Sequence, residues 1–145
     1  MAYKNQTVYL DRYHYFKVGP LPDTWKLKMG KNPGIIFVQP KNGSRIATEA
    51  MCGGSFEDMP LVLSTAEILI GMKDLRTLKS ESWKLNERSA LYTKANASLD
   101  GVPIQINIVV LKKNECEFDF YSIARPSHAD QVTSDFLTFV KGFDY

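Results

Sequence analysis

The stretch that decides the fold is Leu91–Val110, LYTKANASLDGVPIQINIVV, in which two strand-like runs flank Asp100-Gly101. An Asp-Gly pair between alternating runs signals a two-residue type I′ hairpin, because both central residues of that turn need a positive φ. A two-residue loop pairs Leu99 with Val102, and every following pair on that face is apolar or threonine. Register and turn agree, so the stretch predicts a β-hairpin with one apolar face.

The neighbouring sequence extends this hairpin into a four-stranded meander. A three-residue loop at Lys112–Asn114 is expected to lead into the next strand, with Val110 opposite Cys116. That register gives the meander one apolar face and one polar face. Leu78–Leu85, which contains a tryptophan, is expected to add a fourth strand on the other side.

The N-terminal third predicts further strands. Thr7–Val18 is rich in tyrosine and aliphatic residues, which suits a pleated surface, and we expect it to form one strand. Ile35–Pro40 and Arg45–Met51 flank an Asn-Gly pair, a second hairpin signal. Pairing about that dipeptide places Phe37 opposite Thr48.

A first helix is predicted between the N-terminal hairpin and the meander. Apolar residues recur at helical spacing from Met59 or Pro60 to about Lys73. Asp58 is expected to be its N-cap, since a short acidic side chain accepts hydrogen bonds from the first helical N–H groups.

A second helix is predicted from about Ala129 to Lys141, with Ser127 as its cap and Gly142 as its stop. Strands occur in blocks and do not alternate with helices, which favours an antiparallel sheet. We therefore expect a single α+β domain, residues 1–145. It should have a mostly antiparallel sheet of about six to seven strands, packed with two main helices.

Length and charge limit the classes of function. The 145 residues suit one domain, and no apolar run reaches the roughly 18 residues of a membrane span. A net charge of +2 is too small to indicate nucleic-acid binding. Residues 1–46 hold eight basic and two acidic residues, and the remainder holds ten and fourteen. Such asymmetry can mark a docking face, but we favour mutual neutralisation of the two halves in the fold.

Cys52 and Cys116 both fall on the apolar side of their predicted strands, and two states remain open. Buried free thiols are one, because free cysteine is among the most buried residue types. A disulfide between the N-terminal hairpin and the meander is the other, and it indicates an oxidising compartment. Intact mass before and after alkylation without reductant distinguishes the two.

No residues form a recognisable catalytic or metal-binding motif, so we expect a non-enzyme without a cofactor. Neither His14 nor His128 has a second ligand at metal-binding spacing. Glu115, Glu117 and Asp119 alternate along one predicted strand. Paired carboxylates can act as acid and base, but this alternation is what any half-buried strand shows, so we predict a solvated face.

Aromatic residues supply the candidates for partner binding. Tyrosine suits interfaces because it combines contact area with a polar tip. On an edge strand, the aromatic residues of Thr7–Val18 would dock a protein; on a paired strand under a helix they would be core, the placement we favour. The candidate partner-binding residues are Tyr13, Tyr15 and Trp25.

The segment Phe16-x-Val18-x-x-Leu21-Pro22-x-x-Trp25 resembles the opening of Mog1/PsbP-like domains, including small bacterial lipoproteins. The hairpin, the helix, the meander and the phenylalanine-rich last helix follow in the same order. The resemblance implies a sheet covered by helices on both faces, an α/β/α sandwich, and a non-enzymatic role. Members of the group look like adaptors: one binds a small nuclear GTPase and another an oxygen-evolving photosynthetic complex.

Taken together, these features predict an accessory protein that binds another protein, bacterial and associated with the cell envelope. Bacterial members of the group are often exported and lipid-anchored through an N-terminal cysteine. This sequence has neither that cysteine nor a signal peptide, so any anchor is expected to lie on a segment it lacks, and a cytoplasmic location stays open. One alternative is a carrier with an apolar cavity beside Trp83 or Tyr92. The other is a hydrolase that uses the acidic residues, with strongly raised pKa values in a cleft.

Overall fold

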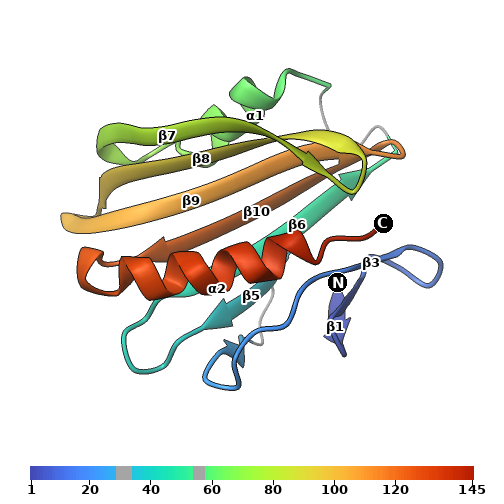
Figure 1. The fold of residues 1–145 in the computed structure, drawn as a ribbon, viewed down its shortest axis with the longest axis horizontal. Helices are drawn as coiled ribbons and strands as arrows, with labels where there is room; N and C mark the ends of the chain where they lie inside the picture. The colour runs from blue at the N-terminus through green and yellow to red at the C-terminus, as the bar shows by residue number, and fades with distance from the viewer. Residues whose placement is uncertain (29–33, 54–57) are drawn as a thin grey trace.

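The computed structural model describes residues 1–28, 34–53 and 58–145 (Figure 1). The strands are β1 (Ala2–Lys4), β2 (Thr7–Tyr9), β3 (Tyr15–Lys17), β4 (Lys26–Leu27), β5 (Ile35–Val38), β6 (Arg45–Cys52), β7 (Lys73–Leu85), β8 (Arg88–Leu99), β9 (Val102–Lys113) and β10 (Cys116–Ala124). The helices are α1 (Leu61–Ile68), the 3-10 helix η1 (Pro126–His128) and α2 (Ala129–Lys141).

The strands form a three-stranded sheet, β1-β2-β3, and a seven-stranded sheet in the order β4-β5-β6-β10-β9-β8-β7. Every strand pair in both sheets is antiparallel. The predicted α+β class, with seven strands in its main sheet and two main helices, is therefore confirmed. The small N-terminal sheet was not predicted.

The β8–β9 hairpin has the predicted register. Asp100 and Gly101 form its turn with φ values of 51° and 79°. Leu99 pairs with Val102, and the predicted pairs continue along both strands. β7 pairs with β8 as the expected fourth strand, but it begins before Leu78.

The β9–β10 hairpin departs from the prediction. Its loop consists of two residues, Asn114 and Glu115, with φ values of 51° and 63°. Val110 consequently pairs with Asp119 instead of Cys116. The predicted register assumed one apolar and one solvated face. Both faces of the central strands are covered by helices, so the apolar alternation does not fix the register there.

The β5–β6 hairpin is displaced by two residues from the prediction, because Phe37 pairs with Ile46 and not with Thr48. The chain turns through residues 40–43, and the Ser44 N–H donates to the Asn42 side chain at 2.9 Å. The Asn-Gly pair therefore ends a longer loop and does not centre a two-residue turn. Since the shift is an even number, the inward-facing residues remain the same.

The predicted single strand over Thr7–Val18 is wrong. The segment forms two antiparallel strands, β2 and β3, with Tyr9 opposite Tyr15. Between them the Asp11 side chain accepts hydrogen bonds from the backbone N–H groups of Tyr13 and His14 and so stabilises a turn. Val8 and Phe16 are the buried pair that fastens this hairpin to the core.

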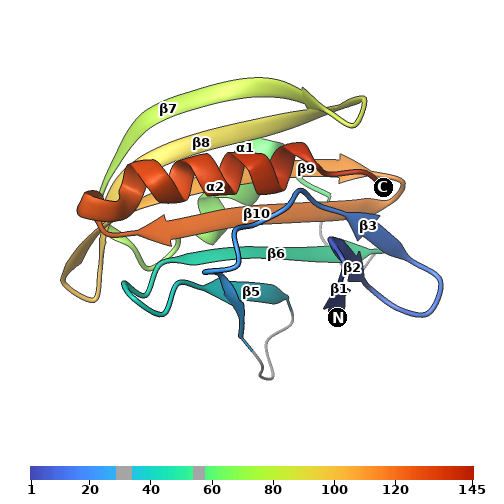
Figure 2. The ribbon, with the colours of Figure 1, turned by 60° about the horizontal axis from the view of Figure 1, so that its bottom comes forward.

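The two helices cover opposite faces of the seven-stranded sheet, as the resemblance implied (Figures 1 and 2). The α2 side holds the larger core, which is rich in phenylalanine. Rings from three parts of the chain meet edge to face there: Phe16, Phe118, Phe120, Phe139 and Phe143. On the other side, apolar residues of β8, β9 and α1 form a smaller cluster around Ile106 and Ile108.

The helix ends differ from the predicted ones. α2 has the predicted span and its C-cap is Gly142, but Ser127 lies inside η1, and the N-cap makes no side-chain hydrogen bond. α1 is shorter than predicted, and its N-cap is Pro60. Asp58 instead forms an ion pair with Lys112 at 2.7 Å, so it is not available as a cap. None of the helices in the described part of the chain has the length and apolar character of a membrane span.

β7 is one of the two edge strands of the main sheet, opposite β4, and is the curved outer strand in Figure 2. Most of its residues are exposed, and its pairing with β8 is shifted at two places. Six of its thirteen residues are charged: Lys73, Asp74, Arg76, Lys79, Glu81 and Lys84.

Candidate functional site

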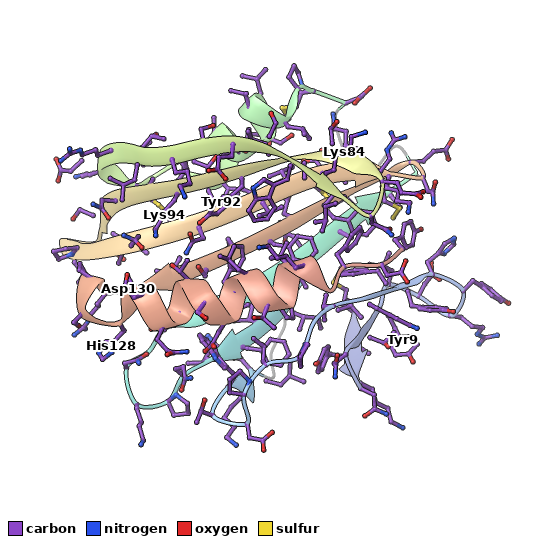
Figure 3. All side chains as sticks on the ribbon, viewed as in Figure 1. Tyr9, Lys84, Tyr92, Lys94, His128 and Asp130 are labelled. Carbon is purple, nitrogen blue, oxygen red and sulfur yellow. A yellow bond between two sulfur atoms is a disulfide. The ribbon has the colours of Figure 1, made fainter. Side chains whose placement is uncertain are left out.

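The β2–β3 hairpin carries three tyrosines on its solvent side. Tyr9 and Tyr15 are cross-strand partners with ring centres 5.9 Å apart, and they are 40% and 53% exposed. Tyr13 projects from the loop and is 78% exposed. The core placement predicted for these tyrosines is wrong, although Phe16 is fully buried. We call Tyr9, Tyr13 and Tyr15 the tyrosine patch; Tyr9 is labelled in Figure 3, away from the main sheet.

The loop between these strands is held by Asp11. Its carboxylate accepts hydrogen bonds from the N–H groups of Tyr13 and His14 at 2.7 and 2.8 Å, and from His14 Nδ1 at 2.8 Å. The hydrogen bond from Tyr13 and those from His14 keep the pKa of Asp11 below its usual value. A loop ordered in this way loses less conformational entropy when a partner binds.

The outer face of the small sheet is basic beside its tyrosines. Lys4, Thr7 and Lys17 form a cross-strand row next to the row that contains Tyr9 and Tyr15. Within the described ranges there are three ion pairs, and none joins a basic residue of 1–46 to an acidic residue of the remainder. Ion pairing of the two halves is therefore absent from that part of the chain.

Trp25 is a structural residue and offers no ring to a partner. It is 5% exposed, and its Nε1–H donates to Asp135 Oδ2 at 2.9 Å. The hydrogen bond joins the segment after β3 to α2, across 110 residues of sequence. Of the three candidate partner-binding residues, only Tyr13 and Tyr15 are on the surface.

Cys52 and Cys116 form a disulfide. They are direct partners at the ends of β6 and β10, where the N-terminal hairpin meets the meander. Of the two states that the sequence left open, the structure contains the bonded one. Disulfides persist in oxidising compartments and are rare in the cytosol.

The acidic residues of β10 do not share a solvated face. Glu115 is in the turn, whereas Glu117 and Asp119 are 5% and 7% exposed, on the face that α1 covers. Burial, together with the nearby charges of Glu117, Glu49 and Glu67, raises the pKa of Asp119 to about 7. Asp119 Oδ1 accepts no hydrogen bond from the described residues.

The raised pKa of Asp119 meets one condition for a catalytic acid, but the residue is only 7% exposed, which limits the access of a substrate to its carboxyl. The neighbours that act on it are all carboxylates. Within residues 1–28, 34–53 and 58–145, no three His, Cys, Asp or Glu side chains are placed to hold a metal ion.

A groove of about 840 Å³ lies between β7–β8 and α2, beside Trp83 and Tyr92. This is where an apolar carrier was expected to have its cavity. Its lining is basic, however, and we call it the lysine groove. Its charged residues are Lys79, Glu81, Lys84, Lys94 and Lys141.

Sequence reasoning missed the lysine groove, although a signal existed. Lys79, Glu81 and Trp83 alternate on β7 and therefore share a face. Leu137 and Lys141 are four residues apart on α2 and form one stripe. What the sequence does not show is that β7 and α2, far apart in the chain, lie on two sides of one groove.

Comparisons with known proteins show similarity in structure only. No protein-family profile matches the sequence, and no curated protein sequence matches it. Cyanobacterial PsbP (CyanoP) from Synechocystis is similar with a TM-score of 0.63 and 12% identity, over 89% of this chain and 85% of that one.

LpqN, described as involved in cell envelope biogenesis of Mycobacterium tuberculosis, has a TM-score of 0.61 and 14% identity, over 88% of this chain and 82% of that one. A protein from Bacteroides thetaiotaomicron has a TM-score of 0.61 and 11% identity over 89% of this chain. This chain spans only 44% of the length of the Bacteroides protein.

The similarity to CyanoP and LpqN extends over most of all three chains and agrees with the observed architecture. The two covered faces are those that the resemblance implied, and the two helices and the antiparallel main sheet are those predicted from the order of the elements. At these levels of identity the similarity concerns the fold and not the activity. The chain has the Mog1/PsbP-like α+β fold.

Proposed function

We propose that this chain is a non-enzymatic accessory protein that binds another protein through the tyrosine patch, in an oxidising compartment such as the bacterial cell envelope. The observation that carries the proposal is the exposure of Tyr9, Tyr13 and Tyr15 on a hairpin whose loop is already ordered. Solvent-exposed aromatic residues on a preorganised loop favour protein binding, because tyrosine is among the residues that dominate interface energies.

The charge around the patch supports an acidic partner surface. Lys4 and Lys17 lie on the same face as Tyr9 and Tyr15, and Arg12 lies in the loop. The Asp11 carboxylate is occupied by the hydrogen bonds of the loop. A partner with exposed carboxylates would therefore meet complementary charge, which speeds association and helps to select the partner.

The disulfide supports the proposed location in an oxidising compartment. A bond between Cys52 and Cys116 is expected to persist outside the reducing cytosol. LpqN, which has the same fold, is described as acting in cell envelope biogenesis, and this also supports an envelope location. The non-enzymatic role is supported by the burial of the only carboxyl with a strongly raised pKa in the described ranges.

The test compares the wild-type protein with the double variant Tyr13→Ser/Tyr15→Ser. Both proteins are immobilised, exposed to an envelope extract of the source cells, and the retained proteins are quantified by mass spectrometry. The proposal predicts a protein that is retained by the wild type and lost with the variant. Once purified, that protein should bind the wild type with an affinity at least about tenfold higher than its affinity for the variant, because the variant lacks two interface tyrosines.

The matched control is Leu75→Ser/Leu78→Ser, which removes two exposed apolar side chains from β7. This variant should retain the same partner as the wild type. Equal retention by the tyrosine variant, or loss of the partner only in the β7 variant, would refute the tyrosine patch as the binding surface. Thermal denaturation of all three proteins checks that each is folded.

A further inference from the structure

The lysine groove has an ordered aromatic wall. Trp83 on β7 and Tyr92 on β8 lie with ring centres 4.6 Å apart and planes inclined by 35°. Tyr92 is buried, whereas Trp83 is only half-buried. Trp83 therefore offers part of its indole ring to the groove, and the ring of Tyr92 packs against it.

A buried hydrogen-bond network fixes this wall in place. The Tyr92 hydroxyl donates to Asn107 Oδ1 at 2.6 Å, and Asn107 Nδ2 donates to the hydroxyls of Ser122 and Thr133 at 2.9 Å each. The network connects β8, β9, β10 and α2. Because α2 forms the opposite side of the groove, both sides are held at a fixed separation, and a ligand need not order them.

The charges of the groove are not balanced from within. Four lysines and one glutamate line it, a net charge of +3. Lys79 pairs with Glu81 at 3.6 Å, but no carboxylate of the described residues lies within ion-pair distance of Lys84, Lys94 or Lys141. Alternation along β7 places Lys84, which follows Trp83, on the opposite face of the sheet, so the ammonium groups that face the groove without a fixed counter-ion are those of Lys94 on β8 and Lys141 on α2.

One of these ammonium groups already lies over the aromatic wall. Lys141 Nζ is 5.6 Å from the centre of the Trp83 ring. An anion that pairs with Lys141 would therefore be brought beside that ring. A planar group attached to the anion could then contact the exposed part of the indole.

We propose that the lysine groove binds a small organic anion with a planar ring and two or three acidic groups. The ring contacts Trp83, and the acidic groups pair with Lys94 and Lys141. Carboxylate, phosphate and sulfonate groups all supply the required charge. A purely apolar ligand does not fit, because it would leave these ammonium groups without counter-charge and cover them from water. This inference is independent of the tyrosine patch, which is on a different sheet.

In the experiment, the NMR signal of Trp83 reports on the groove, and the signal of Trp25 serves as the control. In the ¹H–¹⁵N NMR spectrum of the labelled protein, each indole N–H gives one signal, and Trp83→Phe assigns them. Benzene-1,3,5-tricarboxylate is the probe, because it is planar and carries carboxylates around its ring for both Lys94 and Lys141. The Trp83 signal should shift in a saturable way at concentrations up to about 10 mM. The Trp25 signal, which comes from a buried indole bonded to Asp135, should not shift.

The matched variants change lysine to glutamine. Lys94→Gln/Lys141→Gln removes both of these groove charges and should raise the Kd at least about tenfold, since the ligand then loses its two charged contacts. Lys73→Gln makes the same change on β7 outside the groove and should leave the Kd within about twofold. An unchanged Trp25 signal shows that each variant is folded.

Two further probes separate charge from shape. Citrate has three carboxylates but no ring and should bind more weakly, and benzyl alcohol has a ring but no charge and should not bind. Raising the salt concentration should weaken binding of the tricarboxylate to the wild type, even without any variant. The proposal is overturned if the Trp83 signal does not saturate or if the double variant binds as tightly as the wild type. It is also overturned if citrate binds as tightly as the ring compound, or if only an acidic peptide such as hexaglutamate binds.

Discussion

Replacing Asp119 by asparagine removes a buried carboxyl whose ionised form destabilises the folded state. The carboxyl of Asp119 is 7% exposed and faces Glu117 on its own strand, Glu49 on β6 and Glu67 on α1. Its pKa is raised from 3.8 to about 7, first by burial and then by these three carboxylates. The folded protein therefore binds the proton of Asp119 more tightly than the unfolded chain does.

The sign of the effect follows from that difference. Below about pH 4 the residue is protonated in both states and costs nothing. As the pH rises from about 4 to 7, the unfolded chain loses the proton of Asp119 first, so the free energy of unfolding falls. Above the pKa of the folded state, the titration of Asp119 no longer changes the free energy of unfolding. The rise of about three units in the pKa of Asp119 lowers the free energy of unfolding by about 4 kcal/mol at pH 8. About 2.5 kcal/mol of this loss develops between pH 5 and pH 8. Relaxation around the ionised carboxylate makes this an upper limit.

Urea denaturation of the wild type and Asp119→Asn at pH 5 and pH 8 measures the effect. The variant should be more stable than the wild type at pH 8, and its advantage should shrink by about 1–2.5 kcal/mol at pH 5. Asp23→Asn, at an exposed position, is the control and should follow the wild type at both values. Parallel behaviour of wild type and Asp119→Asn across this range, or a variant that is less stable at pH 8, would refute the reasoning.

Three other changes test the packing. Cys52→Ser/Cys116→Ser opens a link across 64 residues and should lower the free energy of unfolding by about 2–4 kcal/mol, measured by denaturation without reductant; no difference would show that the thiols are not bonded. Asn107→Leu leaves the hydroxyls of buried Tyr92 and Ser122 and of part-buried Thr133 without their partner and should lower the free energy of unfolding by about 2–4 kcal/mol in urea denaturation, whereas a neutral result would contradict the network. Gly19→Ala places a Cβ against the carbonyl of Thr138 on α2 and should lower the Tm by several degrees; an unchanged Tm would show that the two backbones are farther apart.

How far the fold can be predicted is seen in two neighbouring hairpins. Asp100-Gly101 is a strong turn signal, and its strands pair as the sequence indicates. Asn114-Glu115 forms a turn of the same length, but glutamate is an uncommon residue at positive φ, so no turn signal marked it. Hydrophobic alternation could not correct the error, because β9 and β10 are buried on both faces.

The candidate sites were less predictable because they depend on contacts between distant parts of the chain. Trp25 has a polar ring nitrogen, but its acceptor is on α2, and only the folded structure brings the two together. The exposure of Tyr13 likewise depends on a loop that Asp11 stabilises, within what resembled a continuous strand. The lysine groove requires β7 and α2 to lie on either side of the same space.

The free edge at β7 also bears on how this protein tolerates high concentration. A long edge strand exposes backbone donors and acceptors to which the same strand of another molecule can pair, which is a route to fibrils. The lysines and acidic residues of β7, together with its two register irregularities, oppose such stacking. Neutralising those side chains, by acetylation or by substitution, would therefore favour pairing of β7 between molecules, even though the interior of the fold would be unchanged.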